Sequence, residues 1–175
     1  MKNRFYNQDD WQTPKWFYDE LDALYHFDFD PCPLEFDFDG LLCEWGQCNF
    51  VNPPYSFHKK EAFVEKAVEE QAKGRTSVFL LPVSTSTKLF HEIIIPKAQV
   101  VRFLYKRIPF IGVNSHGEYV NWHLESLSGV PAPEGVVHVK ASGQQDSMLV
   151  VFEGRKTWST VTAANILDKS APGSA

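Results

Sequence analysis

The hydrophobic positions of the chain switch repeatedly between helical and strand-like spacing, so the sequence predicts alternating helices and strands. Phe17, Leu21 and Leu24 recur at intervals of four and three residues directly after Thr13-Pro14. This spacing places one apolar stripe on a short helix, with Thr13 as its N-cap and Pro14 at its first position. We therefore expect the first helix to begin at Pro14.

Two further helices are predicted in the middle of the chain. Apolar residues repeat at helical spacing over residues 63–68, and Gly74 follows where a helix commonly ends. This pattern predicts a helix over about residues 59–73. The next helix should contain the apolar residues Leu89, Phe90, Ile93 and Ile94 and should end at Pro96, because proline cannot donate a helical hydrogen bond.

Continuous apolar runs predict strands that are buried on both faces of a sheet. The clearest run covers residues 77–82, and a closing strand is predicted over residues 148–152. Residues 99–104 are also strand-like. Phenylalanine and aspartate alternate over residues 27–30 and again over residues 36–39, which is typical of half-buried strands. Because strands alternate with helices, we expect an α/β fold with a mainly parallel sheet.

Composition indicates one globular domain, which we place over residues 1–155, followed by a C-terminal tail over residues 156–175. With 175 residues, 43% of them hydrophobic and 14% aromatic, the chain can bury a proper core and is not a disordered protein. Its apolar runs are too short to cross a membrane, and residues 1–6 lack the apolar core of a signal peptide. We therefore expect a cytoplasmic protein without membrane contact.

Cysteine spacing gives no indication of a metal site. The three cysteines, Cys32, Cys43 and Cys48, are an odd number and do not follow the Cys-x-x-Cys pattern of zinc ligands. We interpret them as free, buried thiols and expect no bound metal.

Charge is distributed unevenly along the chain, whose net charge is −5. Residues 1–44 include 11 acidic and 3 basic residues, whereas residues 45–175 include 11 acidic and 14 basic residues. Phosphate contacts need lysine and arginine, so a nucleic acid would approach the second part. An ordinary solvated surface explains the same basic residues equally well.

The most informative segment is Asn52-Pro53-Pro54-Tyr55, which follows the apolar pair Phe50-Val51. Because proline cannot donate to a sheet ladder, a strand should end here in a stiff turn at its carboxyl end, where ligands bind in open α/β sheets. The Asn52 side-chain oxygen and the Pro53 carbonyl can both accept hydrogen bonds from a planar amino group. The Tyr55 ring can stack on the heterocycle that carries this group. A proline-terminated strand with a packed tyrosine is the purely structural alternative.

Asn-Pro-Pro-Tyr resembles the catalytic motif of amino-group methyltransferases that use S-adenosylmethionine. Four further segments match, in order, the small phage-type branch of the Dam DNA adenine-N6 methyltransferase family: Asp-Trp-Gln-Thr-Pro at 10–14, Phe-Asp-Pro-Cys at 29–32, Leu-Leu-Pro at 80–82 and Ser-Met-Leu-Val-Val-Phe at 147–152. The resemblance covers about residues 9–153. It implies a compact Rossmann-like methyltransferase fold with a shortened sheet, S-adenosylmethionine as cofactor, and double-stranded DNA as substrate in a bacterial or phage-infected cell.

The resemblance also implies roles for individual residues. Asn52, Pro53, Pro54 and Tyr55 would hold the amino group of a flipped-out base. The residues implied in cofactor binding are Trp11, Gln12, Thr13, Pro14, Asp30, Pro31 and Asp39. A carboxylate at Asp30 or Asp39 suits the ammonium or ribose part of the cofactor, because it accepts hydrogen bonds and carries negative charge. Solvated acids at strand ends are the alternative for both.

One part of the methyltransferase pattern is missing. No Gly-x-Gly loop follows Asp30-Pro31, and only 22 positions separate Asp30 from Asn52. This separation is too short for two strand–helix units, so we expect a truncated or permuted sheet. It leaves open how the adenosine half of the cofactor is held.

Residues 105–135 interleave amides and aromatic residues among glycines and prolines, and the variable target-recognising part of the resembled family falls about here. Amides and aromatics serve base-edge contacts and flipped-base pockets, so we favour a DNA-contacting loop region over a structural hairpin. The predicted DNA-binding residues are Lys59, Lys88, Arg102, Lys106, Arg107, Asn114, His116 and Trp122.

Taken with the resemblance, the sequence predicts transfer of a methyl group from S-adenosylmethionine to adenine N6 in DNA, by a monomer or a homodimer. Two alternatives stay open. The same chemistry could act on cytosine N4, an RNA base or a protein glutamine. A catalytically silent DNA- or partner-binding module could also keep the fold, and the missing glycine loop and the net negative charge favour that alternative.

Overall fold

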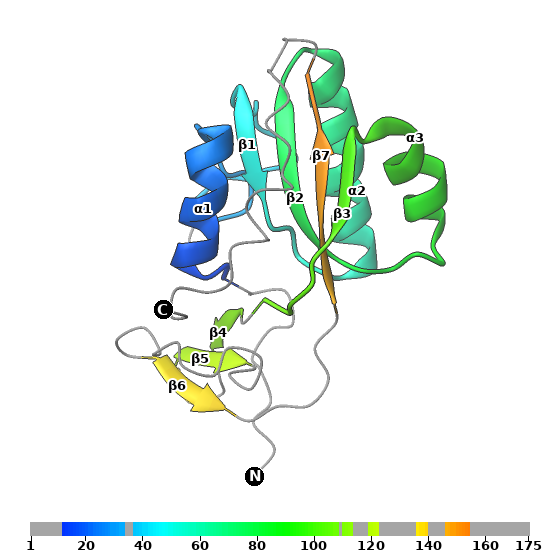
Figure 1. Ribbon diagram of the computed structural model, residues 1–175. Helices are drawn as coiled ribbons and strands as arrows, with labels where there is room; N and C mark the ends of the chain where they lie inside the picture. The colour runs from blue at the N-terminus through cyan, green and yellow to red at the C-terminus, as the bar shows by residue number, and fades with distance from the viewer. Residues whose placement is uncertain are drawn as a thin grey trace.

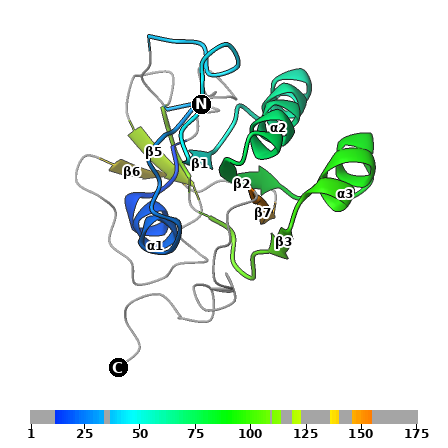
Figure 2. The same cartoon turned by 90° about the horizontal axis from the view of Figure 1, so that it is seen from above.

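The computed structural model describes residues 12–33, 37–108, 110–113, 119–122, 136–139 and 146–154. In these residues a four-stranded sheet lies between two layers of helices (Figure 1, Figure 2). Helix α1 (Lys15–Tyr25) covers one face, and α2 (Phe57–Ala72) covers the other together with the π-helical segment η1 (Leu89–Ile94), which continues into α3 (Ile95–Lys97). None of the described helices is long and apolar enough to span a membrane.

The main sheet has the strand order β1-β2-β7-β3. Its strands are β1 (Cys48–Val51), β2 (Thr76–Pro82), β7 (Ser147–Phe152) and β3 (Val100–Phe103). Strands β1 and β2 are parallel, whereas β7 is antiparallel to both β2 and β3. Strands β1, β2 and β3 therefore run in one direction, and their carboxyl ends lie along the same edge of the sheet.

The α/β prediction is confirmed, but the sheet is mixed where we expected a mainly parallel one. Strand β3 ends at the carboxyl edge, and β7 begins at that edge, beside Leu104: the Leu104 N–H donates to the Ser147 carbonyl at 2.9 Å. A strand that starts at the carboxyl edge has to run back against its neighbours. The apolar run at residues 148–152 predicts a buried strand correctly but contains no information on its direction.

Side chains from alternate strand positions fill a hydrophobic layer on each face. On the α1 side, Phe17 and Leu21 pack against strand residues that include Phe50 and Leu80. On the opposite side, helix α2 and η1 pack against the remaining strand positions, among them Phe79. All seven residues of β2 are buried, as predicted for a strand covered on both faces.

Two helix predictions need correction at their ends. Helix α1 begins at Lys15, because Pro14 keeps an extended ψ of 136° and acts as the N-cap residue. The Pro14 carbonyl, not the Thr13 hydroxyl, accepts the first N–H groups, those of Phe17 and Tyr18, at 3.0 and 3.1 Å. The segment predicted to end at Pro96 ends one residue later, because η1 continues through Ile95 and Pro96 to Lys97.

The C-terminus of α2 agrees with the prediction. Gly74 follows directly after the Lys73 C-cap with φ at +88°, a left-handed conformation that glycine adopts without strain. The helix ends at Ala72, one residue before the predicted end, and starts at Phe57, two residues before the predicted start.

The two segments in which phenylalanine and aspartate alternate differ in secondary structure. Residues 27–30 add a parallel bridge beside β1, where Phe29 pairs with Asn49 and the Phe50 N–H donates to the Phe29 carbonyl at 3.0 Å. The strand predicted over residues 36–39 is wrong, since residues 37–39 bend into a turn. Asp39 Oδ1 accepts a hydrogen bond from the Leu41 N–H at 2.9 Å, and such a side-chain turn competes with strand pairing.

A second, smaller sheet occupies part of the region predicted as a loop. It comprises β4 (Ile111–Val113), β5 (Tyr119–Trp122) and β6 (Val136–Val139), with β4 antiparallel and β6 parallel to β5. In Figure 1 this sheet lies beyond the carboxyl edge of the main sheet. The predicted C-terminal tail lies outside the described residues.

Candidate functional site

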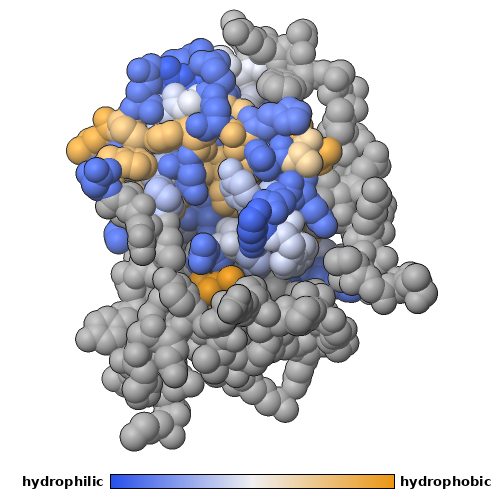
Figure 3. Space-filling view, turned by 90° about the vertical axis from the view of Figure 1, so that its left-hand side faces the viewer, coloured by the Kyte–Doolittle hydropathy of each residue, from blue (hydrophilic) through white to orange (hydrophobic). Residues whose placement is uncertain are grey.

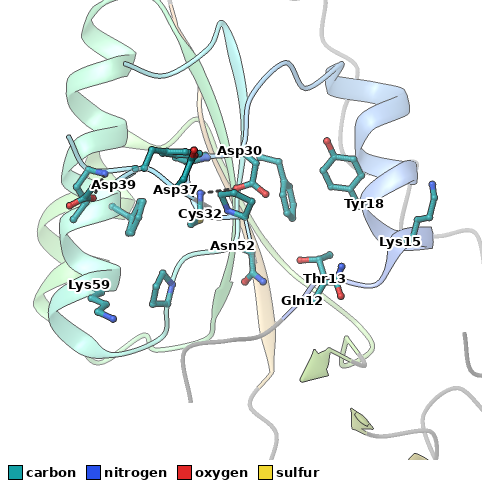
Figure 4. Close-up of a pocket in the computed structure, with 18 of the residues that line it drawn as sticks. Gln12, Thr13, Lys15, Tyr18, Asp30, Cys32, Asp37, Asp39, Asn52 and Lys59 are labelled. Carbon is teal, nitrogen blue, oxygen red and sulfur yellow. Dashed lines mark hydrogen bonds between the residues drawn. The ribbon is translucent and has the colours of Figure 1, made fainter. Parts of the chain in front are cut away.

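A cleft of about 1160 Å³ opens at the carboxyl end of β1 (Figure 4). Its walls come from the start of α1, the segment after Phe29, the turn at residues 37–41, and α2. Figure 3 views the molecule from the side of α1 and shows hydrophilic and hydrophobic residues next to one another on this face. The lining residues are Gln12, Thr13, Lys15, Tyr18, Asp19, Asp30, Pro31, Cys32, Pro33, Asp37, Phe38, Asp39, Gly40, Leu41, Phe50, Asn52, Pro54, Lys59 and Phe63.

The cleft brings together residues that the sequence predicts for separate tasks. Five of the predicted cofactor residues line it, and so do two of the four residues of the catalytic turn and one predicted DNA contact. These residues are Gln12, Thr13, Asp30, Pro31, Asp39, Asn52, Pro54 and Lys59. In Figure 4, Asn52 lies between Asp30 and the Gln12–Thr13 segment. Pro14 is buried at the start of α1 and does not line the cleft, and Trp11 lies outside the described residues.

Asp30 is a partly buried carboxylate whose charge is not matched by a nearby cation. Burial raises the pKa of Asp30 from 3.8 to about 6, against the opposing effect of a hydrogen bond from Cys32. That bond is donated by the Cys32 N–H to Asp30 Oδ1 at 2.9 Å. Among the described residues, no lysine, arginine or histidine forms an ion pair with Asp30. A bound cation would therefore stabilise the charged form.

Three buried side-chain oxygens at or beside the cleft accept no hydrogen bond from the described residues. They are Thr13 Oγ1, Asn52 Oδ1 and the Tyr55 hydroxyl oxygen. Asn52 does make other polar contacts, including a hydrogen bond from its backbone N–H to the Cys32 sulfur. A fourth such oxygen, Asn49 Oδ1, belongs to β1 and does not line the cleft. Buried polar atoms are nearly always hydrogen-bonded in native proteins, so the oxygens at the cleft are suited to a polar ligand.

Pro53 and Tyr55 lie beside the cleft and do not line it. Pro53 is buried, and the Tyr55 ring meets the Phe110 ring edge-on, with centroids 6.0 Å apart and planes at 88°. Burial raises the pKa of the Tyr55 hydroxyl above its usual value, so this group stays protonated. The predicted stacking of Tyr55 on a base remains a prediction.

All three cysteines are free, as predicted. Cys48 is buried, and Cys32 and Cys43 are half-buried, so the prediction of burial is confirmed fully only for Cys48. Burial, followed by the nearby charge of Asp30, raises the pKa of Cys32 well above its usual value. A thiol of this kind stays protonated and is a poor nucleophile. Within the described residues, no three acidic, histidine or cysteine side chains are grouped so as to hold a metal ion.

Among the predicted DNA-binding residues whose side chains the structure describes, only Lys59 lines the cleft. Arg102 lies on β3, at the opposite edge of the main sheet from β1, and Lys106 and Arg107 follow that strand. Arg107 Nε donates to Asp146 Oδ1 at 2.9 Å. Lys88 is exposed at the start of η1. The side chains of Asn114, His116 and Trp122 lie outside what the structure describes.

Several lining residues are absent from the predicted site. Lys15, Tyr18 and Asp19 follow Thr13-Pro14 at helical spacing, so they lie on the same side of α1 as the predicted segment and could have been found from it. Lys15 is paired with Asp19 at 2.6 Å. Asp37 and Phe38 were assigned to a strand, and only the turn at Asp39 brings them to the cleft.

The lining suits a cationic ligand that also has a flat apolar part. Four aspartates line the cleft, namely Asp19, Asp30, Asp37 and Asp39, against two lysines, Lys15 and Lys59, and Lys15 is already paired with Asp19. Three phenylalanines contribute apolar walls, namely Phe38, Phe50 and Phe63. Carboxylates accept hydrogen bonds from hydroxyl and ammonium groups, and aromatic rings pack on heterocycles. A donor set of this composition fits a positively charged nucleoside derivative.

The family model and the known protein that match this chain have the same description. A family model described as DNA N-6-adenine-methyltransferase (Dam) matches residues 2–169. A protein of Haemophilus phage HP1 (strain HP1c1), named DNA N-6-adenine-methyltransferase, is 31% identical over 126 residues, which cover 64% of this chain and 71% of the relative. No solved structure matches the chain significantly.

Proposed function

Since the chain belongs to the DNA N-6-adenine-methyltransferase (Dam) family and methylates adenine N6 in DNA, we propose that it does so with S-adenosylmethionine held in the cleft at the end of β1. The observation that carries this proposal is the meeting of Asn52, Asp30 and Thr13 around one cleft, although they are widely separated in the sequence. Ligands of open α/β sheets bind at this edge.

The cleft residues fit the cofactor. Asp30 would hold its positively charged methionine end, because a carboxylate without an internal cation gains most from an external one. Gln12 and Thr13 would line the same end, with Thr13 Oγ1 gaining the hydrogen bond that it lacks within the described residues. When bound, S-adenosylmethionine supplies an activated methyl group.

The turn at residues 37–41 would take the place of the missing glycine loop. Asp39 closes this turn through its hydrogen bond to the Leu41 N–H, which presents Asp37 and Phe38 to the cleft. Carboxylates suit ribose hydroxyls, and a phenylalanine ring suits the face of adenine. We assign the adenosine half of the cofactor to this turn.

Asn52 would orient the amino group of the target adenine. The lone pair of that nitrogen is delocalised into the ring and is a poor nucleophile. Hydrogen bonds accepted by Asn52 Oδ1 and the Pro53 carbonyl would hold the amino hydrogens, direct the lone pair toward the methyl group, and stabilise the positive charge that develops on nitrogen. The stiff Pro53-Pro54 pair fixes this geometry in advance.

An adenine inside a duplex cannot reach this cleft, so the base has to leave the stack, at a cost of a few kcal/mol. Tyr55 would offset part of this cost by stacking on the base, at the carboxyl edge of the sheet. Lys59, Lys88, Arg102, Lys106 and Arg107 would contact phosphates of double-stranded DNA, and the second sheet would contact its bases. A monomer or a homodimer could act in this way.

We also propose that the main sheet is a shortened Rossmann-like sheet. Three strands of one direction, helices on both faces and a cleft at their carboxyl edge support this assignment. The antiparallel strand β7 is then an addition between β2 and β3.

A methyl-transfer assay tests the proposal. Purified protein with tritiated S-adenosylmethionine is offered duplex DNA, denatured DNA, RNA and protein, and the digested DNA is analysed for N6-methyladenine and N4-methylcytosine. We expect N6-methyladenine from DNA, loss of turnover by about 100- to 1000-fold in Asn52→Ala, which loses its acceptor oxygen, and measurable turnover in Asn52→Asp, which keeps an acceptor oxygen.

Both variants should bind S-adenosylmethionine like the unmodified protein, because the proposed role of Asn52 lies with the base. Full turnover by Asn52→Ala would contradict the assigned role of the residue. Label in RNA or protein instead of DNA would contradict the substrate.

A further inference from the structure

Residues Phe110 and Ile111 stand at the point where the second sheet meets the cleft. Ile111 is the first residue of β4, and both side chains are buried, with exposed fractions of 6% and 8%. Phe110 belongs to the hydrophobic layer under α1, together with Leu104 and Ile108. The beginning of the second sheet is therefore anchored in the core of the main one.

Ile111 is joined to the cofactor side of the cleft through the backbone. Its N–H donates to the Gln12 carbonyl at 2.9 Å, and the Gln12 N–H donates to the Ile111 carbonyl at 2.7 Å. This reciprocal pair is an antiparallel bridge. Gln12 and its neighbour Thr13 line the cleft, so a shift of β4 has to carry this wall with it or break the two hydrogen bonds.

Phe110 contacts Tyr55, the last residue of the proposed catalytic turn, through its aromatic ring. Its ring meets the Tyr55 ring edge-on, with 6.0 Å between centroids and 88° between planes. The Tyr55 hydroxyl forms no hydrogen bond with the described residues, so packing rather than a polar contact fixes the direction of the ring. An edge-on aromatic pair has a preferred geometry, which an aliphatic neighbour does not reproduce.

Resting on the proposed function, we propose that Phe110 is a positioning residue for the catalytic turn, and that Phe110 and Ile111 together link DNA engagement by the second sheet to occupancy of the cofactor cleft. Ile111 holds one wall of the cleft and Phe110 holds Tyr55 on the other side. Any movement of β4 on DNA then acts on the Gln12–Thr13 wall of the cleft and on the catalytic turn beside it. Thermodynamic linkage requires the effect to be reciprocal, so cofactor binding strengthens DNA binding by the same factor as the reverse.

The test compares two identical substitutions in one hydrophobic layer. Phe110→Leu removes the ring that contacts Tyr55, whereas Phe17→Leu removes a fully buried ring of the same layer that contacts Trp16. The readouts are thermal stability, kcat at saturating cofactor and DNA, cofactor affinity by calorimetry, and DNA affinity with and without S-adenosylhomocysteine. DNA carrying 2-aminopurine at the target position reports, by fluorescence, how the flipped base is seated.

We expect Phe110→Leu to lower kcat about tenfold, the size of effect that loss of an oriented aromatic pair can produce. Cofactor affinity should stay within about twofold, while the gain in DNA affinity from S-adenosylhomocysteine falls and the 2-aminopurine signal changes. Phe17→Leu should lose stability but keep kcat and the linkage. Phe110→Tyr, which retains the ring, should recover kcat to within about threefold.

Equal kcat and equal linkage in Phe110→Leu and Phe17→Leu would overturn the inference. If Phe110→Leu does not fold, the unmodified protein decides: a DNA affinity that S-adenosylhomocysteine leaves unchanged would overturn the linkage between the second sheet and the cofactor cleft. Failure of the proposed function is distinguishable, because the unmodified protein would then show no methylation of DNA, and both proposals would fall.

Discussion

Asp30 and Glu70 are a partly buried and a fully buried carboxylate at opposite ends of the same sheet, and they differ in how many cationic side chains pair with them. The Glu70 side chain is 0% exposed and forms ion pairs with Lys66 and Lys73, both at 2.9 Å, and with Arg75. Burial alone would raise the pKa of Glu70, but the hydrogen bonds from these three cations outweigh it and hold the pKa at about 2. Asp30 has only the hydrogen bond from Cys32, and its pKa lies at about 6.

This difference in charge compensation indicates that the sheet edge near Glu70 serves the fold, whereas the edge near Asp30 serves ligand binding. Glu70 lies at the end of α2, where its carbonyl also accepts the N–H groups of Lys73 and Arg75 and so fixes the turn into β2. Its charge is compensated entirely within the chain. Asp30 lies at the cleft, where compensation has to come from a bound cation, and we assign that cation to the cofactor.

Removal of Glu70 should have the largest effect on folding. Glu70→Ala leaves Lys66, whose side chain is only 16% exposed, without Glu70 as its partner, while Arg75 keeps its ion pair with the exposed Glu44. Breaking a buried ion pair by removing one partner costs about 3–5 kcal/mol of unfolding free energy. Urea unfolding measures this loss. Cofactor affinity should be unchanged in the folded variant. A loss of affinity without a loss of stability would contradict the assignment of Glu70 to folding and of Asp30 to cofactor binding.

Asp30→Asn should act in the opposite direction on stability. The difference between the pKa of about 6 and the ordinary value of 3.8 corresponds to at most about 3 kcal/mol of unfolding free energy that the charged carboxylate costs above pH 6. The neutral variant should regain part of this energy and lose S-adenosylmethionine affinity by more than about tenfold. Urea unfolding and calorimetry at pH 8 measure the two effects. A destabilised variant with full cofactor affinity would contradict the assignment of Asp30.

Acidification should distinguish the two carboxylates without any mutation. Because the folded state raises the pKa of Asp30, this group makes unfolding free energy fall as pH rises from about 4 to about 6, and its contribution is constant above that range. Cofactor affinity should fall as pH drops below 6, by up to about tenfold per pH unit, because the proton on Asp30 has to be displaced. Glu70, whose pKa is lowered, contributes stability that is lost only as pH falls from 4.5 toward about 2.

These pH effects are checked by calorimetric titration between pH 5 and pH 8 with the unmodified protein and Asp30→Asn. The variant should show a flat profile over the same range. A profile that is equally steep in both proteins would assign the titration to another group.

Thr13→Val should give the smallest effect. The substitution replaces a buried hydroxyl that lacks a hydrogen bond within the described residues by a methyl group of similar size. Unfolding free energy should therefore stay equal or rise by about 1 kcal/mol, while cofactor affinity falls several-fold through loss of one hydrogen bond. Thermal unfolding and calorimetry measure the two quantities. Loss of stability would show that the hydroxyl serves the fold.

The sequence predicts the elements that local pattern determines. Helix α2, the buried strand β2 and the end of β1 at Val51, just before the Asn-Pro-Pro segment, are present where periodicity and proline placement indicate them. The direction of β7, the π-helical segment η1 and the second sheet depend on long-range packing, which apolar spacing does not encode. Sequence reasoning was therefore reliable for β1 and its turn and unreliable for the topology around them.

The same distinction between local pattern and long-range packing applies to the prediction of the site residues. Asn52, Asp30 and Thr13 could be proposed from motif residues, and the structure brings them to one cleft. Asp37 and Phe38 could not, because alternation of phenylalanine and aspartate favours a strand, whereas the Asp39 side-chain hydrogen bond favours a turn. The position of Tyr55 against Phe110 is likewise a tertiary contact that the tetrapeptide does not determine.

The most direct test of the account is the number of protons released when S-adenosylmethionine binds at pH 6, obtained by calorimetry in buffers of different ionisation enthalpy. With a pKa of about 6, Asp30 is half protonated at this pH, so cofactor binding should release about half a proton, and Asp30→Asn should release none. The release should also vanish at pH 8 in the unmodified protein. Binding without proton release at pH 6, or equal release by the variant, would contradict the claim that the Asp30 carboxylate, which has no cationic partner among the described residues, pairs with the cofactor.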